Sequence, residues 1–79
     1  MILDCANGVG ATAMTDVINA PEFQQRLNIK TINTDPEPTH LNDGCGAEFV
    51  HKDQKLPSNW SAAEDANKKC ACFDGDADR

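Results

Sequence analysis

The pattern of apolar and polar positions divides the first part of the chain into a strand, a helix and a second strand. The run ILDCA at residues 2–6 is mainly apolar and leads into the glycine turn NGVG, which predicts a buried strand followed by a tight turn. Apolar residues then recur at helical spacing until Pro21, so we predict a helix over about residues 9–20, with a possible further turn in EFQQRL. NIKTIN at residues 28–33 predicts a second strand, which the prolines of DPEP end.

The second half of the chain begins with a turn-rich stretch, residues 39–57, for which we expect mostly loop. Ser61 is followed three residues later by Glu64, a capping-box pattern that predicts a helix of about two turns. The apolar run CACF at residues 70–73 is too short for a helix and favours a strand buried on both faces. Together with the βαβ pattern of the first 35 residues, these elements predict an α/β fold with a mostly parallel sheet and flanking helices.

Composition and charge narrow the classes of function. At 79 residues the chain is at most one small domain, and its net charge of -6 with no basic run argues against nucleic acid as a partner. The apolar runs are far shorter than the roughly 20 residues that span a membrane, and the N-terminus lacks the pattern of a signal peptide. We therefore expect a soluble, cytoplasmic protein, with its four cysteines reduced rather than paired in disulfides.

The candidate chemistry is concentrated in FDGDADR at residues 73–79, where Asp74, Asp76 and Asp78 alternate with a glycine and an alanine. In a strand the outer two side chains would lie roughly 13 Å apart, and in a helix the middle one would point about 200° away from the first. Only a curled loop brings all three carboxylates together, and Gly75 and Ala77 are small enough to permit it. Because like charges repel in such a curl, we expect a hard divalent cation, Mg²⁺, to compensate them. Arg79 could neutralise a carboxylate or hold a phosphate.

Several interpretations of this stretch remain open on the residues alone. An EF-hand also begins D-x-D-x-D, but Arg79 stands where its glycine is needed. An aspartyl phosphatase would use two of the carboxylates and leave the third without a role. A solvated acidic turn needs no cation, and a metal loop for phosphoryl transfer on a sugar phosphate uses all three. The last is favoured because the stretch follows a predicted buried strand, and ligands of α/β sheets bind at the carboxyl ends of strands.

A second glycine motif suggests a different function. GVGATA, from Gly8 to Ala13, fits the dinucleotide-binding fingerprint between a strand and a helix, with Asp35 as a candidate ribose-binding acid. Asp35 lies 27 residues after Gly8, later than the expected 20 or so. Any tight strand-to-helix turn requires glycines, so a structural turn is the preferred interpretation and half of a dinucleotide-binding domain is an alternative.

FDGDADR resembles the metal-binding loop of the α-D-phosphohexomutase superfamily. LDCANGVGA, and the segment from LN to CGAEFV, resemble the second domain of the phosphoacetylglucosamine mutase branch of that superfamily, so that the resemblance runs over residues 2–79. The resemblance implies an incomplete three-layer α/β domain, a fragment whose partner domains carry the phosphoserine, sugar-binding and phosphate-binding loops. The chain alone is then expected to be inactive.

The same resemblance implies a function for the complete protein. The complete protein would be an intramolecular phosphotransferase that interconverts N-acetylglucosamine 6-phosphate and N-acetylglucosamine 1-phosphate, with a hexosamine phosphate as substrate. The resemblance also implies that Asp74, Asp76 and Asp78 hold Mg²⁺ and that Arg79 is catalytic, lying beside the transferring phosphoryl group. The non-enzymatic alternative is a simple divalent-cation-binding module. His40 and His51 stand in the loop-rich middle and are expected at the surface, with no role as ligands.

Overall fold

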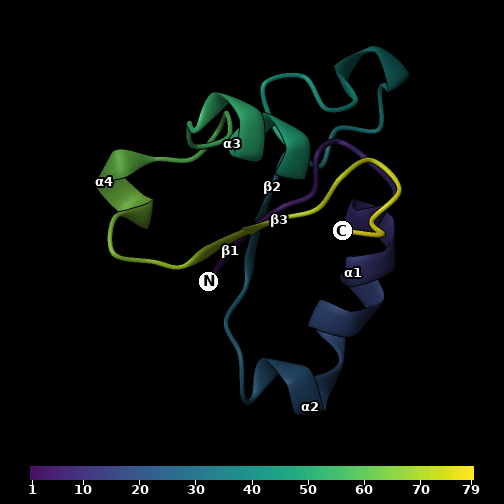
Figure 1. Ribbon diagram of the computed structural model, residues 1–79. Helices are drawn as coiled ribbons and strands as arrows, with labels where there is room; N and C mark the ends of the chain where they lie inside the picture. The colour runs from purple at the N-terminus through teal and green to yellow at the C-terminus, as the bar shows by residue number, and fades with distance from the viewer.

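The computed structural model describes residues 1–79 and contains a small parallel sheet (Figure 1). Its strands are β1 (Ile2–Asp4), β2 (Lys30–Ile32) and β3 (Cys70–Cys72). They are hydrogen-bonded in the order β2-β1-β3, and both pairs are parallel. Asp4 is the register partner of Ile32 on one side and of Cys72 on the other, so the three strands end at one edge of the sheet. The predicted strands and the α/β class are confirmed.

Two helices connect β1 to β2. Helix α1 (Gly10–Asn19) follows the glycine turn as predicted, and α2 (Pro21–Gln24) is the further turn, beginning with proline at its first position where the missing N–H costs nothing. On α1 the side chains of Met14 and Ile18 are half-buried, whereas Val17 is 43% exposed. Part of the apolar face of α1 is therefore left uncovered by the rest of this chain.

The middle segment is more ordered than the sequence indicated. After a short 3-10 helix, η1 (Pro38–His40), the chain forms α3 (Ala47–Asp53), so the expectation of mostly loop is wrong for these residues. Gly46, at φ 90°, turns the backbone into α3, and Gln54, in the left-handed conformation, ends it. An i,i+4 ion pair of 2.6 Å between Glu48 and Lys52 supports the helix.

Helix α4 (Ala62–Asp65) is a single turn, shorter than the two turns predicted. Ser61 is its N-cap and accepts a hydrogen bond from the Glu64 N–H, as the capping pattern requires. The carboxylate that returns to the Ser61 N–H, however, is that of Asp65 rather than Glu64, at 2.9 Å. Lys30 of β2 contacts both acids, at 3.1 Å from Asp65 and 3.2 Å from Glu64, and so fastens α4 to the sheet.

The contacts of Asp65 with the Ser61 N–H and Lys30 predict that the fold is less stable in acid. The hydrogen bond from the Ser61 N–H holds the pKa of the Asp65 carboxyl below its ordinary value of 3.8, and the Lys30 ammonium acts in the same direction. Since the folded-state pKa is the lower one, ionised Asp65 stabilises the fold fully above about pH 4, and this contribution is lost as the pH falls through the folded-state pKa. Hydrogen bonding to the two acids raises the pKa of Lys30 above 10.5, so its contribution is lost only in strong alkali.

The measurement is urea unfolding of the chain, followed by the fluorescence of its single tryptophan, Trp60, which precedes Ser61. We expect Asp65→Asn to lower the free energy of unfolding at pH 7 and the difference from the unaltered chain to shrink below pH 4. Asp16→Asn, at an exposed position on α1, is the control and should differ little at either pH. A difference that stays constant from pH 7 to pH 3 would contradict the assignment.

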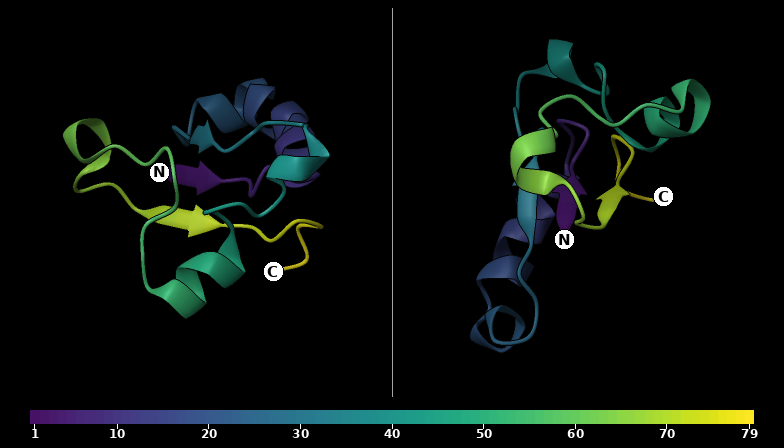
Figure 2. Two further views of the ribbon diagram at one scale, coloured as in Figure 1. Left: turned by 90° about the horizontal axis from the view of Figure 1, so that it is seen from above. Right: turned by 90° about the vertical axis from the view of Figure 1, so that its left-hand side faces the viewer.

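The core lies around β1, the central strand. The buried apolar side chains are Ile2, Leu3, Cys5, Ala6, Ile32 and Cys45. Figures 1 and 2 show the strands between α1 and α2 on one side and α3 on the other, which is the layered arrangement expected. The prediction that β3 is buried on both faces is wrong, because Cys70 and Cys72 are only half-buried and Ala71 is exposed. As an edge strand, β3 has a neighbour on one side only.

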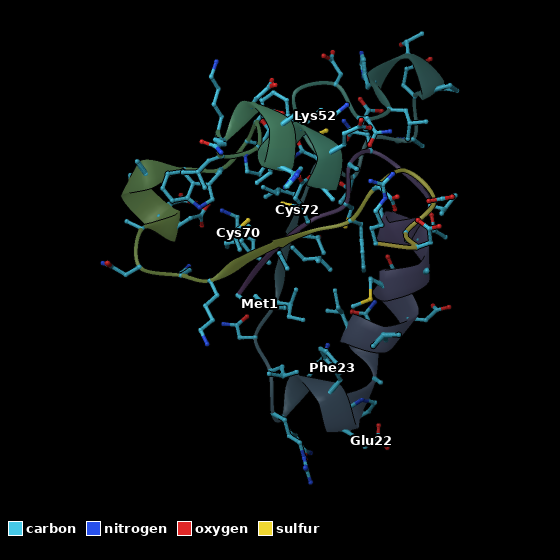
Figure 3. All side chains as sticks on the ribbon, viewed as in Figure 1. Met1, Glu22, Phe23, Lys52, Cys70 and Cys72 are labelled. Atoms are coloured by element: carbon cyan, nitrogen blue, oxygen red, sulfur yellow. The ribbon has the colours of Figure 1, made fainter.

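All four cysteines are free thiols. Figure 3 shows Cys70 and Cys72 on the side of β3 that faces α3, as residues two apart on a strand must lie. Burial, followed by the charge of Asp4, raises the pKa of Cys72 to about 12 and that of Cys45 to about 11, so both thiols stay protonated. None of the helices is long and apolar enough to cross a membrane.

Candidate metal centre

The three aspartates follow β3 in a tight curl of the backbone. The Ala77 N–H donates a hydrogen bond to the carbonyl oxygen of Asp74 at 3.1 Å, which closes a turn, and Ala77 adopts the left-handed conformation with φ 59°. Gly75, although glycine accepts a positive φ most readily, does not adopt one, so the strained position falls on alanine. The loop turns at the carboxyl end of the sheet, where the position of CACF placed it.

Asp74 anchors the curl. Its carboxylate, in a residue that is 7% exposed, accepts a hydrogen bond from the Asp78 N–H at 3.1 Å and from the Arg79 Nε at 2.9 Å. Asp76 and Asp78 are exposed. One carboxylate is therefore buried and fixed by the fold, and two lie at the surface.

The carboxylates of all three aspartates converge. One oxygen from each lies within 4.8 Å of the others. Oxygens bound to one Mg²⁺ at 2.0–2.1 Å lie about 3 to 4 Å apart, so rotation of the exposed Asp76 and Asp78 side chains closes the difference. Three hard oxygen donors with open positions on the solvent side fit Mg²⁺.

Crowding shifts the pKa values of two of these carboxyls in opposite directions. Hydrogen bonding to Asp74 and Asp76 raises the pKa of Asp78. Burial alone would raise the pKa of Asp74, but hydrogen bonds from Asp78 and Arg79 outweigh it and hold that pKa below its ordinary value. Without a cation, the guanidinium of Arg79, 2.9 Å from Asp74, offsets part of the repulsion among the three carboxylates.

The glycine turn after β1 packs against this loop. The Val9 N–H donates to the carbonyl oxygen of Gly75 at 3.2 Å, and a Cβ built on Gly8 would lie 2.3 Å from that oxygen. In a dinucleotide-binding domain the corresponding space admits a pyrophosphate. Here backbone fills it, and Asp35, the candidate ribose-binding acid, instead pairs with His40 at 2.6 Å. GVGATA is therefore a packing motif that supports the aspartate loop.

A cleft of about 450 Å³ opens beside the aspartates. Besides the loop itself it is lined by Leu41, Asn42 and Glu48, residues to which the sequence analysis gave no role. Asn42 has φ 57°, and its amide lies close to Gly75. In the sequence LNDGCG, the asparagine followed by two glycines indicates a turn. This local pattern does not show that the turn borders the acidic loop.

The largest hollow lies elsewhere and offers little chemistry. It measures about 560 Å³, lies between α1 and α2, and is lined mostly by apolar side chains including Phe23, together with Glu22 and Arg26. Figure 3 labels Phe23 and Glu22 on α2. His40 and His51 are both exposed, as expected. The cleft at the aspartates is thus the hollow in which charged groups converge.

Comparison with known proteins identifies the family. The family model described as Phosphoacetylglucosamine mutase AMG1, domain II, matches residues 1–79. Among curated relatives, phosphoacetylglucosamine mutase of Homo sapiens is 40% identical over 77 residues, which are 98% of this chain and 13% of the human protein. Phosphoacetylglucosamine mutase 2 of Schizosaccharomyces pombe is 42% identical over 81 residues, 100% of this chain and 14% of that protein. The chain thus spans about one seventh of these relatives.

Solved structures agree with the sequence comparison. The structure of an N-acetylglucosamine-phosphate mutase of the α-D-phosphohexomutase superfamily, in its substrate complex, matches 99% of this chain and 14% of its own with a TM-score of 0.87 and 39% identity. The Aspergillus fumigatus N-acetylphosphoglucosamine mutase, solved in complex with GlcNAc-6P and magnesium, matches 99% of this chain and 15% of its own with a TM-score of 0.83 and 38% identity. The chain belongs to the phosphoacetylglucosamine mutase family and corresponds to its domain II.

Proposed function

We propose that this chain is the metal-binding domain of a phosphoacetylglucosamine mutase and contributes the Mg²⁺ loop for the reversible conversion of N-acetylglucosamine 6-phosphate and 1-phosphate. The observation that carries the proposal is the convergence of the oxygens of Asp74, Asp76 and Asp78 within 4.8 Å at the carboxyl end of a parallel sheet. A relative solved with GlcNAc-6P and magnesium supports the same assignment. Free thiols and a fold without disulfides suit the cytoplasm, where we place the protein.

The residues of this domain have distinct tasks in the proposed site. Asp74 provides a ligand oxygen whose position the Asp78 N–H and Arg79 fix, while Asp76 and Asp78 complete the oxygen set from exposed positions. When bound, Mg²⁺ neutralises the charge that develops on a transferring phosphoryl group. Arg79 uses its Nε for Asp74 and is 66% exposed, so its terminal N–H groups are available for a phosphoryl oxygen.

The experiment joins this chain to the rest of an enzyme. In a chimera, the chain replaces the matching segment of phosphoacetylglucosamine mutase 2 of Schizosaccharomyces pombe, which it aligns with over its full length. We expect the chimera to interconvert the two N-acetylglucosamine phosphates, to lose activity on treatment with EDTA and to regain it with Mg²⁺. The isolated 79-residue chain should show no turnover, since one seventh of the enzyme does not form the whole site.

The alternative, a cation-binding module without a part in catalysis, predicts a different result. A folded chimera that binds Mg²⁺ but converts neither substrate would favour that module. A chimera that is active and insensitive to EDTA would refute the metal-loop assignment. Glucosamine 6-phosphate, which lacks the acetyl group, serves as the comparison substrate for specificity.

A further inference from the structure

One fully buried carboxylate has no part in the site as described so far. Asp4, at the carboxyl end of β1, is 0% exposed. A buried carboxylate without a cation beside it is costly unless several donors satisfy it. Here its Oδ1 accepts from the Ala6 N–H at 3.0 Å and from the Asn33 amide at 2.9 Å, and its Oδ2 accepts from the Gly46 N–H at 2.7 Å.

These contacts close a ring of hydrogen bonds around the residue that precedes Asp74. The Phe73 N–H donates to the carbonyl oxygen of Asp4 at 2.9 Å, and the Ala47 N–H donates to the carbonyl oxygen of Phe73 at 2.8 Å. The N–H of Gly46, the residue before Ala47, donates to the Asp4 carboxylate and so completes the ring. The ring thus connects β1, the first turn of α3 and the last residue before the aspartate loop.

We propose that Asp4 is a positioning residue for the metal loop: through Gly46 and Ala47 it fixes the backbone of Phe73, and hence the place from which Asp74 presents its carboxylate. The inference rests on the proposed Mg²⁺ function. Asp4 does not touch the cation site itself. Residues that hydrogen-bond a metal ligand typically change metal affinity by about 10- to 100-fold when replaced. Asp4 acts through Gly46, Ala47 and Phe73 rather than on Asp74 directly, so we expect an effect at the lower end of that range.

Asp4→Asn tests the ring with little change in volume. Every group facing the Asp4 carboxylate is a donor, so an asparagine NH₂ opposes an N–H whichever way the amide is turned. The matched control is Asp65→Asn. Asp65 is also 0% exposed and accepts hydrogen bonds from the Ser61 N–H and the Lys30 ammonium. It lies on α4, however, at the other end of the sheet from the aspartate loop.

Metal affinity is measured in the chimera in two ways: by Mn²⁺ binding followed by electron paramagnetic resonance without substrate, and by the Mg²⁺ concentration that gives half-maximal activity. For Asp4→Asn we expect the Mn²⁺ dissociation constant and the half-maximal Mg²⁺ concentration each to rise about ten-fold, with turnover at saturating Mg²⁺ within about two-fold of the parent. For Asp65→Asn both should be unchanged. Equal metal affinities for the two variants would overturn the proposal.

A second variant keeps the proposal testable if Asp4→Asn does not fold. Ala47 is the first residue of α3, where proline is tolerated in the helix itself, and in Ala47→Pro the ring Cδ replaces the N–H that binds Phe73, so the hydrogen bond is lost and the Phe73 carbonyl must move away. We expect it to weaken Mn²⁺ binding in the same direction, and parental binding in this variant would refute the ring. If the unaltered chimera itself binds no Mn²⁺, the proposed function fails together with this inference. Parental binding in Asp4→Asn or in Ala47→Pro contradicts the inference alone.

Discussion

Asp76→Asn in the chimera is expected to reduce turnover at limiting Mg²⁺ by a factor of about 100 or more, while the fold remains intact. The substitution keeps the volume of the side chain and removes one ligand charge. Asp76 is exposed and does not hold the backbone of the curl, since the hydrogen bond that does so goes to Asp74. In the absence of metal the variant should be at least as stable as the parent, because one of three mutually repelling charges is gone.

The measurement is turnover as a function of Mg²⁺ concentration, with circular dichroism to report the fold. Asp16→Asn, an exposed aspartate on α1 outside the cleft, is the control and should behave as the parent does. High Mg²⁺ should restore part of the lost activity, since two of the three carboxylates remain. Parental turnover of Asp76→Asn at limiting Mg²⁺ would exclude a ligand role for this residue.

The βαβ half of the fold could be predicted because its signals are local. The apolar run of β1, the helical spacing of α1 and the prolines after β2 each lie within a few residues of the element they define. Helix α3 was missed because its seven residues contain hardly two turns, and a glycine with φ 90° rather than a capping side chain begins it. Its one local signal is the spacing of Glu48 and Lys52.

The candidate site likewise has a part that local sequence predicts and a part that it does not. The spacing of the aspartates required a curl, and the structure has one. The position of the curl depends on contacts between residues distant in sequence, which no local pattern encodes. Gly8 packs on Gly75, and Asp4 binds Asn33 and Gly46, which lie 29 and 42 residues away. In the sequence, Asp4 is only a polar interruption of an apolar run. The burial of β3 was overestimated because the composition of CAC does not show whether a strand has a neighbour on both sides.

Gly8→Ala is expected to displace the aspartate loop and to abolish most metal binding. A Cβ at this position would lie 2.3 Å from the carbonyl oxygen of Gly75 and 2.9 Å from its Cα. These are backbone atoms, so no side-chain rotation relieves the overlap, and the two turns must separate. Overpacking of this kind costs about 3 kcal/mol, and separation also breaks the hydrogen bond from the Val9 N–H to Gly75.

Gly75→Ala is the matched comparison, because it adds the same methyl group to the other residue of the pair but outside their contact. Its Cβ would meet the side chains of Leu41 and Asn42 at 3.1 Å, and both residues are exposed and able to move. Since Gly75 has no positive φ, alanine fits its backbone, and we expect a loss in Mn²⁺ affinity below about three-fold, within the cost of a conservative change. Measured in the chimera, Gly8→Ala should lose binding far beyond that. Similar affinities for the two variants would mean that the GVG turn does not hold the aspartate loop in place, and the glycines of that turn would then serve only the entry into α1.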